Sequence, residues 1–120
     1  MNRSAKVLAA LALLVAAPCA VQAHAMLDHA SPKVGSTVAS APRELLLWFT
    51  EKLEPAFSTV EVRNAQGVVQ SGKAQVDRND ATQLRVPLKA LPAGTYQVTW
   101  RVLSVDTHRT QGSFSFRVGP

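Results

Sequence analysis

Cysteine is nearly absent from this sequence: Cys19 is the only one among 120 residues, so no disulfide can form within the chain. Many small exported domains depend on disulfides for stability, and that class of scaffold is excluded here. A packed apolar core, or a core together with a bound metal, must stabilise the folded part instead. The length leaves room for one domain.

Runs of like charge are also missing. The 13 lysine and arginine residues outnumber the 8 aspartate and glutamate residues, which gives a formal net charge of +5. The basic residues are scattered singly, and only 6% of all residues are aromatic. Nucleic-acid surfaces need clustered cations, and single-strand binding also needs interleaved aromatic rings. The sequence therefore predicts no nucleic-acid partner.

Long apolar segments are lacking too, apart from one near the N-terminus. The segment 7–17 is rich in Ala, Leu and Val but is shorter than the ~20 residues of a membrane-spanning helix. It follows the positive charges of Arg3 and Lys6 and precedes Val21-Gln22-Ala23, a small-residue pattern that signal peptidase recognises. This order predicts a cleaved secretory signal peptide over 1–23, a folded domain over 24–120 and a periplasmic location.

Cleavage after Ala23 changes the mature chain in two ways. It removes Cys19 and two positive charges, and it makes His24 the N-terminal residue. Ala23-His24-Ala25 is itself an acceptable small-x-small pattern. Cleavage after Ala25 would instead start the mature chain at Met26.

The rest of the sequence has the patterns of β-strands. Strands are predicted over 44–50, 58–63, 84–88, 95–104 and 112–118, with a returning hairpin strand starting at 68. The continuous apolar run in 44–50 favours a strand buried on both faces, whereas 95–104 alternates and places Tyr96, Val98, Trp100 and Val102 on one face. Pro87 should lie at a sheet edge or a strand end. The polar segment 73–82 predicts an exposed loop.

No amphipathic helical pattern competes with these strands. Short strands separated by turns within about a hundred residues are typical of an antiparallel sandwich or barrel. The predicted fold is therefore all-β, a small antiparallel Greek-key β-sandwich or barrel of Ig-like or cupredoxin-like topology.

Two of the three histidines stand in positions that suit a metal. A terminal His24 has a free α-amine and an imidazole, which together can chelate one ion. Asp106 and His108 lie between the two clearest C-terminal strands, and a locally extended segment would project both from one face. Nitrogen and oxygen donors without sulfur suit Cu(II). An Asp-x-His pair is also common in solvated loops, where the aspartate caps a turn, and that interpretation stays open.

The segments around these residues resemble a known family. They are His24, Ser31-Pro32 with Gly35-Ser36, 47–53, 91–102, 104–108 and 112–116. Together they make the chain similar to the CopC family of bacterial copper-resistance proteins, which are small periplasmic copper-binding β-sandwiches. The resemblance covers essentially the whole mature chain.

The resemblance implies a site for one Cu(II) ion made by the α-amine and imidazole of His24, by Asp106 and by His108. It places Glu51 in the outer shell, where the carboxylate would orient a ligand imidazole. Some family members hold Cu(I) in a methionine-rich loop, but after cleavage this chain keeps only Met26. No dedicated Cu(I) site is expected, Met26 is expected to pack rather than bind copper, and His29 is expected to be a partly exposed strand residue.

The predicted function is sequestration of copper, or its delivery to a copper transport protein of the inner membrane, by a monomer without enzymatic activity. One alternative is an oxidative copper enzyme, because polysaccharide monooxygenases also use an N-terminal histidine chelate. Asp106 would occupy the coordination position that such an enzyme needs open. A second alternative is a metal-free Ig-like adhesion or assembly module, which explains the sandwich but not the terminal histidine.

Overall fold

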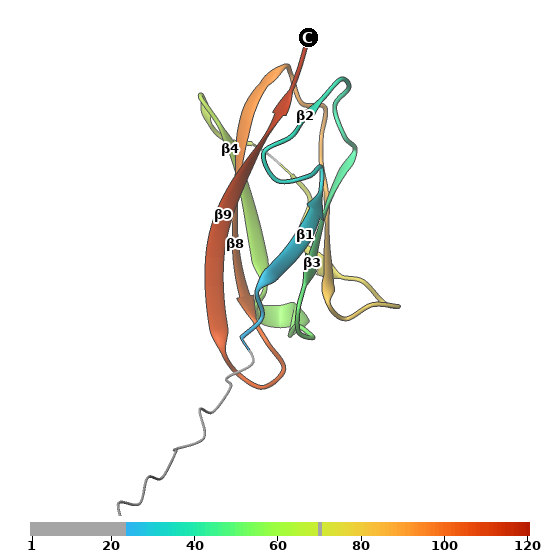
Figure 1. The fold of residues 1–120 in the computed structure, drawn as a ribbon, viewed down its shortest axis with the longest axis vertical. Coiled ribbons are helices and arrows are strands. Elements are labelled where there is room, and N and C mark those ends of the chain that lie inside the picture. Colours follow the sequence, from blue (N-terminus) through green and yellow to red (C-terminus); the bar gives the residue numbers. More distant parts are fainter. Residues whose placement is uncertain (1–23, 70) are drawn as a thin grey trace, which may run out of the picture.

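Two β-sheets packed face to face make up the protein (Figure 1). The structure is a computed structural model that describes residues 24–69 and 71–120. The predicted signal peptide over 1–23 lies outside the described residues. No described segment forms a helix that is long and apolar enough to cross a membrane.

The sheets have four and five strands. The first has the order β1 (Leu27–Ser31), β3 (Glu44–Phe49), β7 (Gln83–Pro87) and β6 (Gln75–Val76), all antiparallel. The second has the order β2 (Thr37–Val38), β9 (Arg109–Val118), β8 (Gly94–Leu103), β4 (Thr59–Asn64) and β5 (Gly67–Val68). Only β2 and β9 pair in parallel, and a short 3-10 helix η1 (Pro55–Phe57) precedes β4. The predicted antiparallel β-sandwich is confirmed.

The core forms between the inner faces of the two sheets. In β8 the predicted alternation is confirmed, because Tyr96, Val98, Trp100 and Val102 are all at most 4% exposed. They face buried β3 side chains, and the Trp100 ring meets the Phe49 ring edge to face with centroids 5.0 Å apart. Each such side chain stabilises the fold by about 1.5–3 kcal/mol when fully buried. The core therefore stabilises the fold without a disulfide.

Two local predictions differ from the structure. In β3 only alternate residues are buried, and Leu46 and Trp48 are partly exposed on the outer face because that side of the first sheet is not covered by a third layer. The segment 73–82 is not entirely loop, since Gln75 and Val76 form β6 and pair with β7. Pro87 ends β7, as predicted, and its carbonyl accepts a hydrogen bond from the Gly72 amide at 2.8 Å.

Three segments meet at one end of the sandwich, where β1 begins and β8 turns into β9 (Figure 1). The turn Ser104–His108 joins β8 to β9, and the segment 50–54 follows β3. The Val105 amide donates to the Lys52 carbonyl at 3.0 Å, and the Thr50 amide donates to the Met26 carbonyl at 2.9 Å. These contacts bring residues 24–26 and 104–108 to the same end of the molecule.

Gly112 allows the Trp100 indole to lie flat against β9. A Cβ atom built at Gly112 would stand 2.5 Å from Cζ2 and 2.9 Å from Cε2 of Trp100. We expect Gly112→Ala to lower the free energy of unfolding by about 1–3 kcal/mol, because the ring must shift within a packed core. Urea unfolding measures this loss. Ser113→Ala, an exposed neighbour, is the control, and equal midpoints for both variants would contradict the contact.

Candidate metal centre

The segment between β8 and β9 is a tight turn. The Thr107 amide donates to the Ser104 carbonyl at 2.9 Å, and the Ser104 amide donates to the His108 carbonyl at 3.0 Å. Thr107 has a φ of +73°, in the left-handed region. The segment is therefore a turn and is not locally extended. Asp106 and His108 approach each other because the chain turns back, not because alternate strand residues share a face.

Ser104 organises the turn from inside. Its side chain is fully buried, and its hydroxyl donates to Asp106 Oδ1 while accepting a hydrogen bond from the His108 amide at 3.2 Å. One hydroxyl thus links the backbone of one candidate ligand to the side chain of the other. Sequence reasoning missed this role, because a serine at the end of a strand pattern carries no signal that its side chain is buried.

At this turn the His108 side chain lies beside the His24 ring on one hand and the Asp106 carboxylate on the other. The imidazole rings of His24 and His108 have centroids 4.9 Å apart and are inclined by 62°. His108 Nδ1 lies 3.3 Å from Asp106 Oδ1, yet the geometry is not that of a hydrogen bond. Within the described chain, His108 Nδ1 is buried without a hydrogen-bond partner. A buried ring nitrogen beside a carboxylate and a second imidazole has the chemistry of a metal ligand.

The Asp106 carboxyl is kept ionised by its surroundings. The hydrogen bond from the Ser104 hydroxyl is the main cause that lowers the pKa of Asp106 below its usual value, and the nearby His108 imidazole lowers it further. Partial desolvation opposes this effect. An ionised carboxylate is the form that coordinates a cation.

His24 reaches the site through a short segment that is joined to the sandwich. Ala25 is fully buried in the core, and His24 itself is partly buried. The Met26 carbonyl accepts a hydrogen bond from the Thr50 amide at 2.9 Å, which extends the pairing of β1 with β3 by one step. The residues just after the predicted signal peptide are therefore part of the folded domain.

Glu51 and the three predicted donors do not form one cluster of side chains. Across 24–69 and 71–120, no group of three His, Cys, Asp or Glu side chains is arranged to hold a metal ion. Glu51 follows Thr50 directly in the chain and is partly buried. The outer-shell role of Glu51 stays a prediction.

The other two candidate residues lie apart from these donors. His29 is in β1, where Nδ1 lies 2.6 Å from Asp28 Oδ2 and the ring stacks on Trp48 with centroids 4.3 Å apart. It is 57% exposed, as predicted for a strand histidine. Met26 is 54% exposed, so the expectation that it packs in the core is wrong. The buried residue of this segment is its neighbour Ala25.

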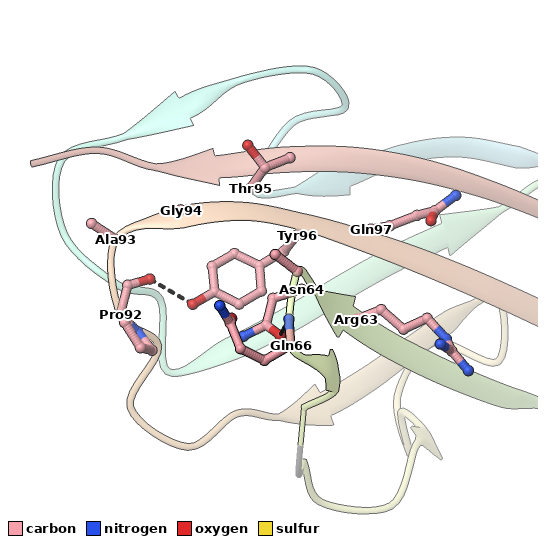
Figure 2. A pocket seen from close by; sticks show the side chains of 10 residues that line it. Arg63, Asn64, Gln66, Pro92, Ala93, Gly94, Thr95, Tyr96 and Gln97 are labelled. Atoms are coloured by element: carbon pink, nitrogen blue, oxygen red, sulfur yellow. Dashed lines mark hydrogen bonds between the residues drawn. The ribbon is translucent and has the colours of Figure 1, made fainter.

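A hollow of about 520 Å³ lies near the β4–β5 turn and the start of β8, at the end remote from the Ser104–His108 turn (Figures 1 and 2). The Tyr96 hydroxyl donates to the Pro92 carbonyl there at 2.5 Å. The lining contains arginine, amide and hydroxyl groups but no His, Cys, Asp or Glu. This hollow therefore does not have the donors of a metal centre.

Removing the Ser104 hydroxyl should change the titration of Asp106. We expect Ser104→Ala to raise the pKa of the Asp106 carboxyl toward its ordinary value, because the main group that lowers it is gone. A carboxyl group whose pKa is lowered in the folded state stabilises the fold at pH values above its ordinary pKa. This stabilisation is lost as the pH falls through the lowered pKa. NMR titration of the carboxyl carbon in metal-free protein measures the shift. Asp80, whose pKa is lowered by Thr82, is the internal control. An unchanged pKa of Asp106 would contradict the assignment of Ser104 as the main group that lowers it.

Comparison with known proteins agrees with the fold. The family model described as the CopC domain matches residues 27–119. Protein YobA of Escherichia coli (strain K12) is 38% identical over 100 residues, which cover 82% of this chain and 81% of that protein. Copper resistance protein C of Xanthomonas campestris pv. juglandis is 38% identical over 103 residues, which cover 80% of each chain.

A solved structure extends the likeness to three dimensions. The crystal structure of CopC from Methylosinus trichosporium OB3b matches with a TM-score of 0.76 and 33% identity, covering 81% of this chain and 95% of that one. The match to the family model begins with the first residue of β1, includes β9 and ends at residue 119. The two-sheet fold and the sequence both establish that this chain belongs to the CopC family.

Proposed function

We propose that the mature chain begins at His24 and binds one Cu(II) ion in the periplasm. The ligands are the α-amine and imidazole of His24, the Asp106 carboxylate and the His108 imidazole. The observation that carries this proposal is the surroundings of His108, whose ring lies against the His24 ring and whose buried Nδ1 has no hydrogen-bond partner although Asp106 Oδ1 is 3.3 Å away. A relative is named copper resistance protein C, and copper binding in copper resistance is the function of this chain as well.

The donor set favours the cupric ion. Amine and imidazole nitrogens with one carboxylate oxygen are borderline-to-hard ligands, and Cu(II) binds such ligands most tightly among the common divalent metals. His24 and Asp106 both lie beside His108, and neither supplies sulfur. Met26 is the only methionine among the described residues, and it is exposed. These features support a Cu(II) site without a separate Cu(I) site.

The burial of Ala25 supports cleavage after Ala23 rather than after Ala25. Cleavage after Ala25 would remove a fully buried core residue and leave a cavity, which costs free energy. It would also remove His24 from the site. Cleavage after Ala23 creates the α-amine that completes the proposed donor set.

An oxidative copper enzyme is the less favoured function. Oxygen chemistry needs an open coordination position, and Asp106 beside His108 Nδ1 is placed to fill one. The family is one of copper-binding resistance proteins. The metal-free module is also less favoured, because it leaves the two facing imidazoles without a role.

We further propose that the protein is a monomer and passes copper to a transport protein of the inner membrane.

Copper titration of the processed protein tests the proposed function. Protein exported with its own signal peptide, with its N-terminus confirmed by mass, should give one tetragonal, nitrogen-rich Cu(II) EPR signal that saturates at about one equivalent. A mature terminus at Met26, or only weak heterogeneous signals, would contradict the proposal. Ascorbate and oxygen should give the copper-loaded protein no turnover of polysaccharide, and turnover would favour the oxidative enzyme.

The ligand assignment predicts two variants that fold but bind copper weakly. His108→Ala, and one residue inserted between Ala23 and His24, should each lower Cu(II) affinity by more than ~100-fold, since each removes a donor rather than an orienting partner. Competition with a chromophoric chelator measures the affinity. His29→Ala is the matched control, and a His108→Ala affinity equal to that of the parent would contradict the site.

Copper affinity should also depend steeply on pH. All three nitrogen donors must be deprotonated to bind, so protons compete with copper and the affinity should fall as the pH is lowered. Competition titrations between about pH 5 and 8 measure the slope. Asp106 is already ionised throughout this range, because its pKa is lowered from the ordinary value. A flat profile would contradict coordination by imidazole and amine.

A further inference from the structure

Copper binding at a chain terminus requires that the terminus be held still. The ends of most domains are poorly ordered unless specific contacts hold them. A loose terminus would have to be ordered when it binds copper, and this entropic cost would lower affinity. Residues that hold the segment His24-Ala25-Met26 in place can therefore raise copper affinity without being ligands themselves.

Thr50 holds this segment from the side of the first sheet. Its hydroxyl accepts a hydrogen bond from the Met26 amide at 3.0 Å and donates to the His24 carbonyl at 3.3 Å. Its own amide donates to the Met26 carbonyl at 2.9 Å. One residue directly after β3 thus contacts the backbone on both sides of Ala25.

Thr110 holds the same segment from the side of the second sheet. It lies in β9, opposite Val102 in β8, and its hydroxyl donates to the Ala25 carbonyl at 2.6 Å. The Ala25 methyl is fully buried in the core between these contacts. Thr110 is two residues beyond His108, so the strand that follows one proposed ligand also fixes the segment that contains the other.

We infer that Thr50 and Thr110 are positioning residues of the copper site. Their hydroxyls join the N-terminal segment to both sheets and hold the His24 ring and amine beside His108 before copper arrives. This inference rests on the proposed copper function and adds to it the means by which a terminal ligand is preorganised. The hydrogen bonds of both hydroxyls go to backbone atoms of 24–26, so their effect on copper is indirect.

Hydroxyl-deletion variants test this role. Thr50→Val and Thr110→Val keep the shape of the side chain but remove the hydrogen bonds, so each should lower Cu(II) affinity about tenfold. At one equivalent of copper, their EPR spectra should show a second species, because the terminus samples more than one position. Thr50→Ser and Thr110→Ser keep the hydroxyl and should restore a single species.

The control is Thr99→Val, the same chemical change on the outer face of the second sheet opposite Ser113. All variants are exported with the native signal peptide, checked by mass for a His24 terminus and compared by thermal unfolding without metal. Thr99→Val should match the parent in affinity and spectrum.

The outcomes separate this inference from the proposed function. A parent protein that gives no one-equivalent Cu(II) signal would overturn the copper site itself. A parent that binds normally, with both valine variants at the parent's affinity and with its spectrum, would overturn only the positioning role. Valine variants that unfold at lower temperature yet bind copper as the parent does would also overturn it, because the threonines would then stabilise the fold alone.

Discussion

The pairing of β8 with β9 is the interaction on which the rest of the structure depends. The two strands pair residue by residue from Gly94 opposite Val118 to Leu103 opposite Arg109, the longest ladder in the molecule. Their inner faces supply the large aromatic side chains of the core, including Trp100 and Phe116. Because the ladder continues to the last pair before the turn, it also places Ser104 and His108 at its end.

The candidate metal centre forms where this ladder meets the N-terminal segment. The turn contributes Asp106 and His108, and the segment before β1 contributes His24. The two parts are more than 80 residues apart in the chain, and they are joined by hydrogen bonds rather than by a shared strand. The candidate ligands all lie outside regular strands, and the rigid sandwich holds the segments that contain them in place.

The comparison of expectation with structure is most informative in the turn. The sequence predicted that Asp106 and His108 would be neighbours, on the assumption of an extended segment. They are neighbours, but in a turn with a left-handed Thr107 and a buried serine hydroxyl at its centre. Similar reasoning failed for Met26, because the apolar character of a residue near the terminus does not reveal which of two neighbours, Met26 or Ala25, enters the core.

The sequence by itself determined the fold class, the longer strands and the candidate donors. Alternation in 95–104 specifies a strand with one buried face, because side chains of a strand point to opposite sides in turn. The sequence also identified His24, Asp106 and His108 as candidate donors, from their chemistry and from the family resemblance. Only the tertiary structure decided how these donors meet, since the distance between His24 and His108 depends on packing between segments far apart in the chain. It alone revealed the buried Ser104 and the contacts of Thr50 and Thr110, because a hydroxyl acquires a role only when folding brings a partner within hydrogen-bond distance.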